Sequence, residues 1–521
     1  MMFYLLSIII YFASFFLILS IFLPKRTFGL HELVKSFLLS VLSIILLSVF
    51  NYFFIQINLL PILLIDIIGL TQIKKFKFLT ISSQEKRVLI GISIYGLVFL
   101  IYYSTFATFL AGDIITHATF IRMILNQDPI RIPLLNSYLT DYPKGFHFFA
   151  SFFASSIGII DSIKLTSVLS LTATLLIIYL VAKKLDVHPE GAVLFAAIFL
   201  PHYFYIFWGG YTSQMAMLFT LSAIYFILSE DKLYLLISLF CIFITQARAF
   251  LFLIPFAIAY TISKRRLTFI TITLSFLTIL TIYYLAQHGF QSPFFFPALL
   301  QDKPYLIKLA IVFIPAVLSI PGYFLSENKT LKRWLILAIL FLFFMDIVRP
   351  EHGDPRRLLE IYYILFSLTS ANVLKTKYKT LIVIFLLLYG SSIMLYDFNK
   401  YKKTFTISSA EIKEFDSAIQ FLNSSKIVNV DSVCSWFFPL KNKDLLIPGP
   451  YMYVTYDTNL LYRVREIGRG EYVNLHLPVC VSRYSFDNSK VPFKETFELK
   501  NISINKNYSI VYNGSLINIL Y

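Results

Sequence analysis

Two ionisable residues four positions apart are the first candidates for chemistry in this sequence. Asp113 and His117 lie in the stretch GDIITHATFIRMI, which follows a long apolar run. In a helix they share one face, because residues at i and i+4 are neighbours. Asp113 could then act as a general base, partly desolvated at a membrane edge, with His117 orienting it or contacting the substrate. The alternative is structural: an aspartate favoured at a helix start, and an interfacial histidine.

A second polar group follows in the stretch DYPKGFHFF. Lys144, His147, Ser151 and Ser155 fall at i, i+3, i+7 and i+11, which predicts a polar stripe along a Phe-rich helix. Such a helix is expected to lie in the membrane interface. Lys144 and His147 are therefore either substrate contacts or the water-facing side of a helix resting on the membrane.

Arginines supply a third group of candidates. Arg356 and Arg357 in RPEHGDPRR could bind a phosphate bidentately, or could be arginines that snorkel at a helix end. This loop contains three arginines and no lysine, which favours the phosphate clamp. Arg248 in TQARAFLF would be costly against lipid, so it should face a cavity or a partner. The other candidate contacts for an anionic, lipid-linked substrate are Arg131, Tyr142 and His352.

The composition indicates a membrane protein. Of 521 residues 58% are hydrophobic and 14% are charged, and the mean hydropathy is +0.73. Apolar windows of about 20 residues, the length that crosses a bilayer as a helix, recur along most of the chain. The first is expected to be a retained helix rather than a signal peptide. The net charge of +16 comes from clusters between the windows, which are topology signals rather than a nucleic-acid surface.

About 14 membrane spans are expected. They are 1–23, 30–52, 55–70, 88–111, 163–183, 191–208, 211–229, 232–247, 249–263, 267–287, 305–325, 333–349, 358–373 and 379–396. The lysines and arginines around residues 74–87, 183–184, 264–266, 329–333 and 375–379 all lie inside only if the chain does not cross between Asp113 and Asp161. Residues 112–161 are therefore expected to form an outer loop with two interfacial helices.

The composition changes after about residue 397. Apolar runs shorten to strand length and Gly, Pro, Asn and charges return, which predicts a small α/β soluble domain over 398–521. By parity this domain lies outside. Cys434 and Cys480 could form a disulfide there, whereas Cys241 lies in an apolar span and is expected to be inert. Residues 1–87 would be extra N-terminal helices, and 88–397 the core.

The residues resemble the GT-C class of membrane glycosyltransferases, which includes protein O-mannosyltransferases and aminoarabinose transferases. The resemblance is carried by an outward span closing on Asp113, the YPKGFH segment over 142–147, the following span ending at Lys183 and Lys184, and DPRRLLEIYYILFSLTSANVL over 354–374. It covers about 88–397 and implies a polyprenyl-phosphate sugar donor and an acceptor on the outer face, whether glycan, lipid or protein. It also implies that Asp113 is the catalytic base and that Arg356 or Arg357 binds the donor phosphate.

Two other functions remain open at this point. A transporter or flippase of lipid-linked saccharides would place charged residues near the membrane midplane, whereas the ionisable groups here gather at one face. A catalytically inactive scaffold of the same fold would act through its tail. The sequence contains no Walker motif, GxSxG elbow or dinucleotide fingerprint. A divalent metal at Asp113 and His117 is the one cofactor considered, although two ligands without a third are a weak metal signal.

Overall fold

The structure is a computed structural model. It describes the following residues: 13–24, 28–54, 60–74, 80–104, 108–109, 112–127, 144–199, 210–246, 249–264, 314, 317–348, 355–404, 406–407, 413–414, 416–418, 420, 428–429, 479–482, 510–513 and 517–520. Side chains are described for most of them. One predicted span, 267–287, lies outside these residues. Seven others fall only partly within them: 1–23, 55–70, 88–111, 191–208, 232–247, 305–325 and 333–349.

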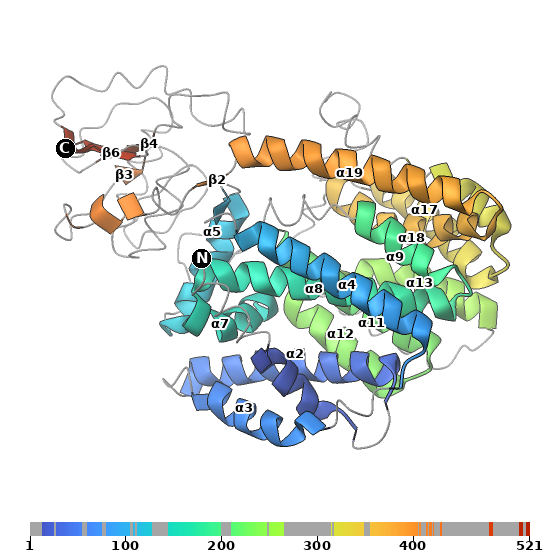
Figure 1. Ribbon diagram of the computed structural model, residues 1–521, viewed down its shortest axis with the longest axis horizontal. Coiled ribbons are helices and arrows are strands. Elements are labelled where there is room, and N and C mark those ends of the chain that lie inside the picture. The colour runs from blue at the N-terminus through green and yellow to red at the C-terminus, as the bar shows by residue number, and fades with distance from the viewer. Residues whose placement is uncertain are drawn as a thin grey trace.

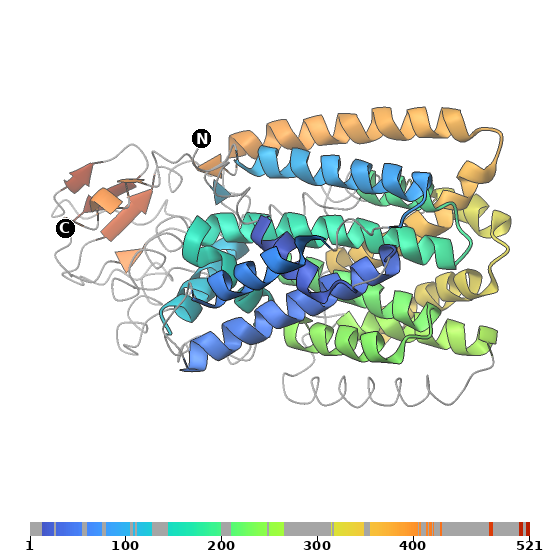
Figure 2. The same cartoon turned by 60° about the horizontal axis from the view of Figure 1, so that its bottom comes forward.

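The described part is mostly helical (Figure 1). After a short apolar helix over Ala13–Phe22, the helices are α2 (Leu30–Phe54), α3 (Leu60–Gln72), α4 (Ser83–Ser104), α5 (Gly112–Leu125), α7 (Gly145–Ile157), α8 (Ile159–Lys184), α9 (Pro189–Phe199), α11 (Tyr211–Leu228), α12 (Lys232–Gln246), α13 (Phe250–Lys264), α17 (Lys329–Val348), α18 (Pro355–Ser370), η3 (Ala371–Lys375) and α19 (Lys379–Thr404). Figures 1 and 2 show α2, α4, α8 and α19 running along the longest axis of the molecule.

Among the described residues, three helices are long and apolar enough to cross a membrane: α2, α8 and α11. Helix α8 lies at the centre and packs against α4, α7, α9 and α11. The hydroxyl groups of Thr166 and Thr174 form hydrogen bonds within this apolar environment, because each donates to the carbonyl four residues earlier at 2.7 Å. Helices at 30–52, 163–183 and 211–229 are thus confirmed.

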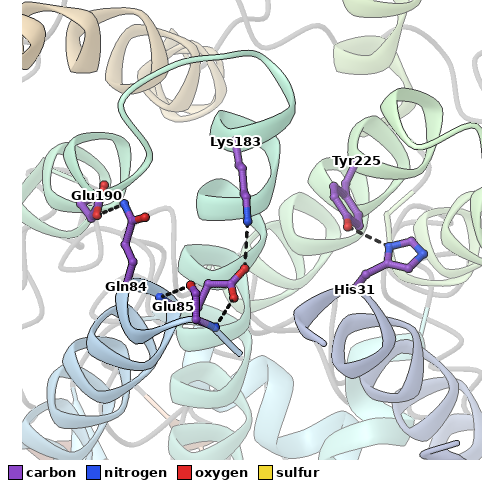
Figure 3. Close-up of polar contacts among 7 residues, drawn as sticks. His31, Gln84, Glu85, Lys183, Glu190 and Tyr225 are labelled. Carbon is purple, nitrogen blue, oxygen red and sulfur yellow. Dashed lines mark hydrogen bonds and ion pairs between the residues drawn. The ribbon is translucent and has the colours of Figure 1, made fainter. Parts of the chain in front are cut away.

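One end of the bundle is joined by polar contacts between helix ends far apart in sequence (Figure 3). Lys183 Nζ at the end of α8 lies 3.0 Å from Glu85 Oε1 at the start of α4. Gln84 donates to Glu190 at the start of α9. His31 of α2 bonds the Tyr225 hydroxyl of α11 at 2.8 Å, and one turn further Lys35 pairs with Asp231 at 2.6 Å. We call this the basic end, because the loops rich in lysine and arginine begin or end there.

The opposite end carries α5 and α7 (Figures 1 and 2). There the Gln127 amide, just past α5, donates to the Asn51 carbonyl near the end of α2 at 2.9 Å. Strand β1 (Thr108–Phe109), just before α5, pairs antiparallel with β2 (Thr406–Ile407), just after α19. We call this the α5–α7 end.

Helix α7 corrects one sequence expectation. Its stripe was expected to supply either substrate contacts or the water-facing side of an interfacial helix, and the burial of His147 (0% exposed) and Ser151 (4% exposed) contradicts the water-facing alternative at these two residues. Ser151 donates to the Phe148 carbonyl of its own helix, and α7 as a whole packs against α2, α5 and α8. An amphipathic pattern marks one face as different from the other but does not say whether protein or water lies there. Gly158, with φ +89°, turns the chain from α7 directly into α8.

The tail contributes short strands. A four-stranded sheet has the order β3 (Val428–Asn429), β4 (Val479–Ser482), β6 (Ile517–Leu520), β5 (Ile510–Asn513), with β3 parallel to β4 and the other pairs antiparallel. Strands β3 and β5 lie within KIVNV and YSIVYNG, two of the strand-length apolar runs of the tail. Cys480 lies in β4, whereas Cys434 lies outside the described residues, so their pairing stays a prediction.

Candidate functional site

The centre of the candidate site is a pair of histidines from two helices. His117 Nδ1 on α5 and His147 Nε2 on α7 lie 2.8 Å apart and form a hydrogen bond. Both rings are buried, with centroids 5.0 Å apart and ring planes tilted 33° to each other. The bond joins positions 30 residues apart in sequence. The structure thus brings together one residue predicted to be catalytic and one predicted to bind substrate.

Aromatic rings surround this pair. Phe146 and Tyr211 each form an edge-to-face contact with His117, with ring centroids 5.6 Å apart, and Phe120 forms one with His147 at 5.1 Å. Phe146 and Tyr211 are themselves stacked at 5.8 Å. Edge-to-face contacts restrict how a ring can turn. The two imidazoles therefore lie in a packed, apolar environment formed by α5, α7 and α11.

The electrostatics keep His147 neutral. Burial lowers the pKa of His147 well below its usual value, and the nearby His117 and Lys144 lower it further. Lys144 Nζ lies 4.1 Å from the centroid of the Phe120 ring, a cation–π contact between the start of α7 and α5. Lys144 and the two imidazoles thus lie together in one apolar environment between α5 and α7.

Three segments far apart in the sequence meet at this end. The first is α5 with α7, and the second is the start of α11, where Gln214 accepts from Ser167 Oγ of α8 at 2.8 Å. The third is the end of α12, where Gly145 of α7 packs so tightly against the Ile244 carbonyl that a Cβ would come within 2.7 Å of it. Polar residues scattered in sequence therefore converge at the α5–α7 end.

The remaining predicted residues are placed less fully. Asp113 is the second residue of α5, one turn before His117, and Arg356 and Arg357 lie in the first turn of α18; their side chains are outside the description. Arg131, Tyr142, Arg248 and His352 lie outside the described residues altogether. Among the ten predicted residues, His117, Lys144 and His147 are the ones whose side chains the structure brings together.

Sequence reasoning missed two members of this neighbourhood. Tyr211 was not among the predicted site residues, yet its ring contacts both His117 and Phe146. Arg122 on α5 is buried, although it was not among the predicted substrate contacts. A buried arginine in the last turn of a short helix beside a membrane is a signal that could have been used, because such a charge is rarely buried without a partner.

The residues present allow proton transfer or hydrogen bonding by imidazole, but they do not complete a metal site. Within the described part of the chain, no group of three His, Cys, Asp or Glu side chains could hold a metal ion. Two histidine nitrogens alone fall short of the three or four protein ligands usual for zinc.

Comparisons with known proteins bring no further information about this site. No family model matches the chain, and neither a curated protein nor a solved structure does.

Proposed function

We propose that the chain is a multi-pass membrane glycosyltransferase of the GT-C kind, which moves a sugar from a polyprenyl-phosphate donor to an acceptor at the outer face of the cell membrane. The observation that carries the proposal is the buried His117–His147 pair, 2.8 Å apart, between α7 and α5, the helix in whose first turn Asp113 lies. A catalytic group needs this kind of restricted, water-poor setting.

The multi-pass arrangement is supported by apolar stripes on the outside of the bundle. On α4 the exposed residues Ile90, Ile94, Leu97 and Ile101 recur at helical spacing. Helices α12 and α19 carry similar stripes, over Leu233–Phe243 and Leu381–Leu388. Stripes of this size on several helices are unusual for a surface in water and fit lipid contact. In the proposal about 14 helices span the membrane, the basic end faces the cytoplasm, and the tail is an extracytoplasmic α/β domain.

The proposed reaction uses groups at the α5–α7 end. The Asp113 carboxylate accepts the proton of the acceptor hydroxyl while that oxygen attacks the anomeric carbon of the sugar. The bond from this carbon to the phosphate oxygen breaks, and the polyprenyl phosphate leaves with the electron pair. His117 contacts the reacting groups beside Asp113. Such proton transfer contributes about 10²- to 10⁴-fold, and orientation of the substrates supplies more.

The negative charge of the donor phosphate suggests roles for the arginines and for Lys144. Arg356 or Arg357 binds the donor phosphate, since a guanidinium matches two phosphate oxygens. Lys144, Tyr142, Arg131, Arg248 and His352 remain proposed substrate contacts. His147 differs from them, because its ring is fully buried and bonded to His117. It is therefore placed behind His117 rather than against the substrate.

The alternative of a transporter or flippase is less well supported. It requires charged groups near the midplane of the bundle, often at broken helices. Here Lys35, Glu85 and Lys183 contact their partners at the basic end, and Lys144 lies at the α5–α7 end. An inactive scaffold would keep the fold without needing Asp113, so it makes a distinct experimental prediction.

The test is transfer of sugar from polyprenyl-phosphate donors by purified membranes that contain wild type, Asp113→Asn or His117→Ala. If Asp113 is the base, Asp113→Asn lowers turnover by about 10²-fold or more while donor binding persists, and His117→Ala costs less. If Asp113 only begins a helix, the asparagine variant is nearly silent, because Asn caps a helix as well as Asp does. Absence of transfer by the wild type with every donor tried would favour the scaffold.

A further inference from the structure

The hydrogen bond between His117 and His147 links two residues whose roles were assigned separately. We propose that His147 is a positioning residue that keeps the His117 ring in one orientation and one tautomer. The inference rests on the proposed function in one respect, namely that His117 is the histidine next to the reacting groups. The geometry on which it depends is the 2.8 Å contact from His117 Nδ1 to His147 Nε2.

A hydrogen bond between two imidazole nitrogens restricts the protons of both rings. One nitrogen must donate and the other must accept. If His147 Nε2 donates, His117 carries its proton on Nε2 and can donate from there. If His117 Nδ1 donates, its Nε2 is an acceptor. Either way, the state of Nε2 in His117 follows from the bond made by Nδ1, which is the usual way in which proteins select a histidine tautomer.

His147 can impose this choice because its own ring is fixed. Its helix is buried from Gly145 to Ala154, and the Phe120 edge lies against the ring at 5.1 Å. Rotating a buried ring requires displacing side chains that are packed at crystal-like density. His117 is fixed from the other side by Phe146 and Tyr211. The two rings therefore meet in one geometry.

A proton relay through His147 is the competing interpretation. A proton passed from His117 Nδ1 to His147 Nε2 would leave a buried imidazolium, unless the proton on His147 Nδ1 left at the same time. Burial disfavours this charge, and the positive Lys144 next to the ring disfavours it further. His147 thus stays neutral and orients its partner.

The experiment is nitrogen NMR on the full-length protein labelled with ¹⁵N-histidine, in detergent. The chain has 8 histidines, and the His117 signals are assigned by their loss in His117→Gln. Wild type is compared with His147→Gln, whose amide reaches about as far as Nε2, and with His147→Phe, which keeps an aromatic ring but no hydrogen-bonding atom. We expect a single His117 tautomer in wild type and in His147→Gln, and a mixture of both tautomers in His147→Phe.

Two results would overturn the proposal: mixed tautomers in wild type, or an unchanged single tautomer in His147→Phe. The signal of His188, at the basic end, reports whether each variant is folded. If His147→Phe does not fold, His147→Asn tests the same loss, because its amide reaches only as far as Nδ1. No sugar donor is needed, so a failed transferase assay leaves this result intact. Where transfer is measurable, kcat should fall in His147→Phe and recover in His147→Gln.

Discussion

A neutral, fully buried histidine makes stability depend on pH. The folded pKa of His147 lies well below that of an unfolded histidine, about 6.5, because of burial and of the neighbouring His117 and Lys144. Above about pH 7 His147 is neutral in the folded and in the unfolded chain, so it does not change the free energy of unfolding with pH. Below about pH 6.5 the unfolded chain binds a proton that the folded chain does not, so the free energy of unfolding falls as the pH falls.

This prediction is tested by thermal unfolding in detergent between about pH 7.5 and about pH 5. The slope of stability with pH approaches about 1.4 kcal/mol per pH unit for one such site at the acidic end. His147→Gln removes the titrating group, so its stability should decline less steeply than that of wild type. Equal slopes for the two proteins would contradict a neutral, buried His147.

The arginines at the start of α18 give a second prediction at the scale of single residues. If Arg356 or Arg357 binds phosphate with two parallel hydrogen bonds, Arg→Lys at that position should weaken donor binding despite the retained charge. Binding of a radiolabelled polyprenyl-phosphate sugar to each Lys variant measures this. Unchanged affinity in both variants would leave only the role of arginines that snorkel at a helix end.

Sequence reasoning reached part of the site. The spacing of Asp113 and His117 predicted one helix face, and both lie on α5. His147 was selected as a polar residue of an amphipathic helix, but its contact with His117 could not be predicted, because helical periodicity says nothing about which helix packs on which. The burial of α7 was missed for a related reason: an apolar face fits lipid and the apolar α2 equally well.

At the scale of elements, the N-terminal helices explain why α7 is buried. Phe15, in the helix over Ala13–Phe22, contacts Phe149 and Phe153 of α7, each with ring centroids 6.5 Å apart. Tyr52 near the end of α2 contacts Phe148. The N-terminal helices, whose purpose the sequence left open, thus cover the helix that carries His147. They are part of the support of the site.

Adjacent phenylalanines provide a matched test of this support. Phe15 is 2% exposed whereas Phe16 is 49% exposed. Phe15→Ala should leave a cavity against α7 and destabilise the protein by about 3–5 kcal/mol. Phe16→Ala should change stability far less. Diethylpyrocarbonate labelling, read by mass spectrometry, should also increase at His147 in the first variant alone. Equal stability and equal labelling of the two variants would contradict the idea that the N-terminal helices support the site.

The close approach of α7 to α12 gives a second prediction for the elements. A Cβ on Gly145 would lie 2.7 Å from the Ile244 carbonyl oxygen and 2.9 Å from Thr245 Oγ1, whereas one on Gly91 would meet nothing within 4 Å. Gly145→Ala should therefore displace the start of α7, with Lys144, and lower the melting temperature and activity. Gly91→Ala should do neither. A silent Gly145→Ala would mean that α7 can shift without consequence.

At the scale of the whole molecule, contacts between helix ends sort the chain into two sides. Lys183 with Glu85, His31 with Tyr225 and Lys35 with Asp231 join segments at the basic end. At the other end the β1–β2 pairing places residue 407, where the tail begins, beside residue 108, just before α5. The tail and the 112–161 loop should therefore leave the membrane on the same side.

The positive-inside rule assigns that side to the outside, because the basic clusters lie at the other end. Single cysteines in a cysteine-free background, at Ser137, Ser485 and Glu327, test this in intact cells. The first two positions lie outside the described residues, in the loop and the tail, and Glu327 lies in the loop before α17 at the basic end. An impermeant maleimide should label Ser137→Cys and Ser485→Cys without permeabilisation, and Glu327→Cys only after it. Labelling of only one of the first two would mean that the chain crosses the membrane an odd number of times between them. The prediction that the loop and the tail lie on the same side of the membrane would then be wrong.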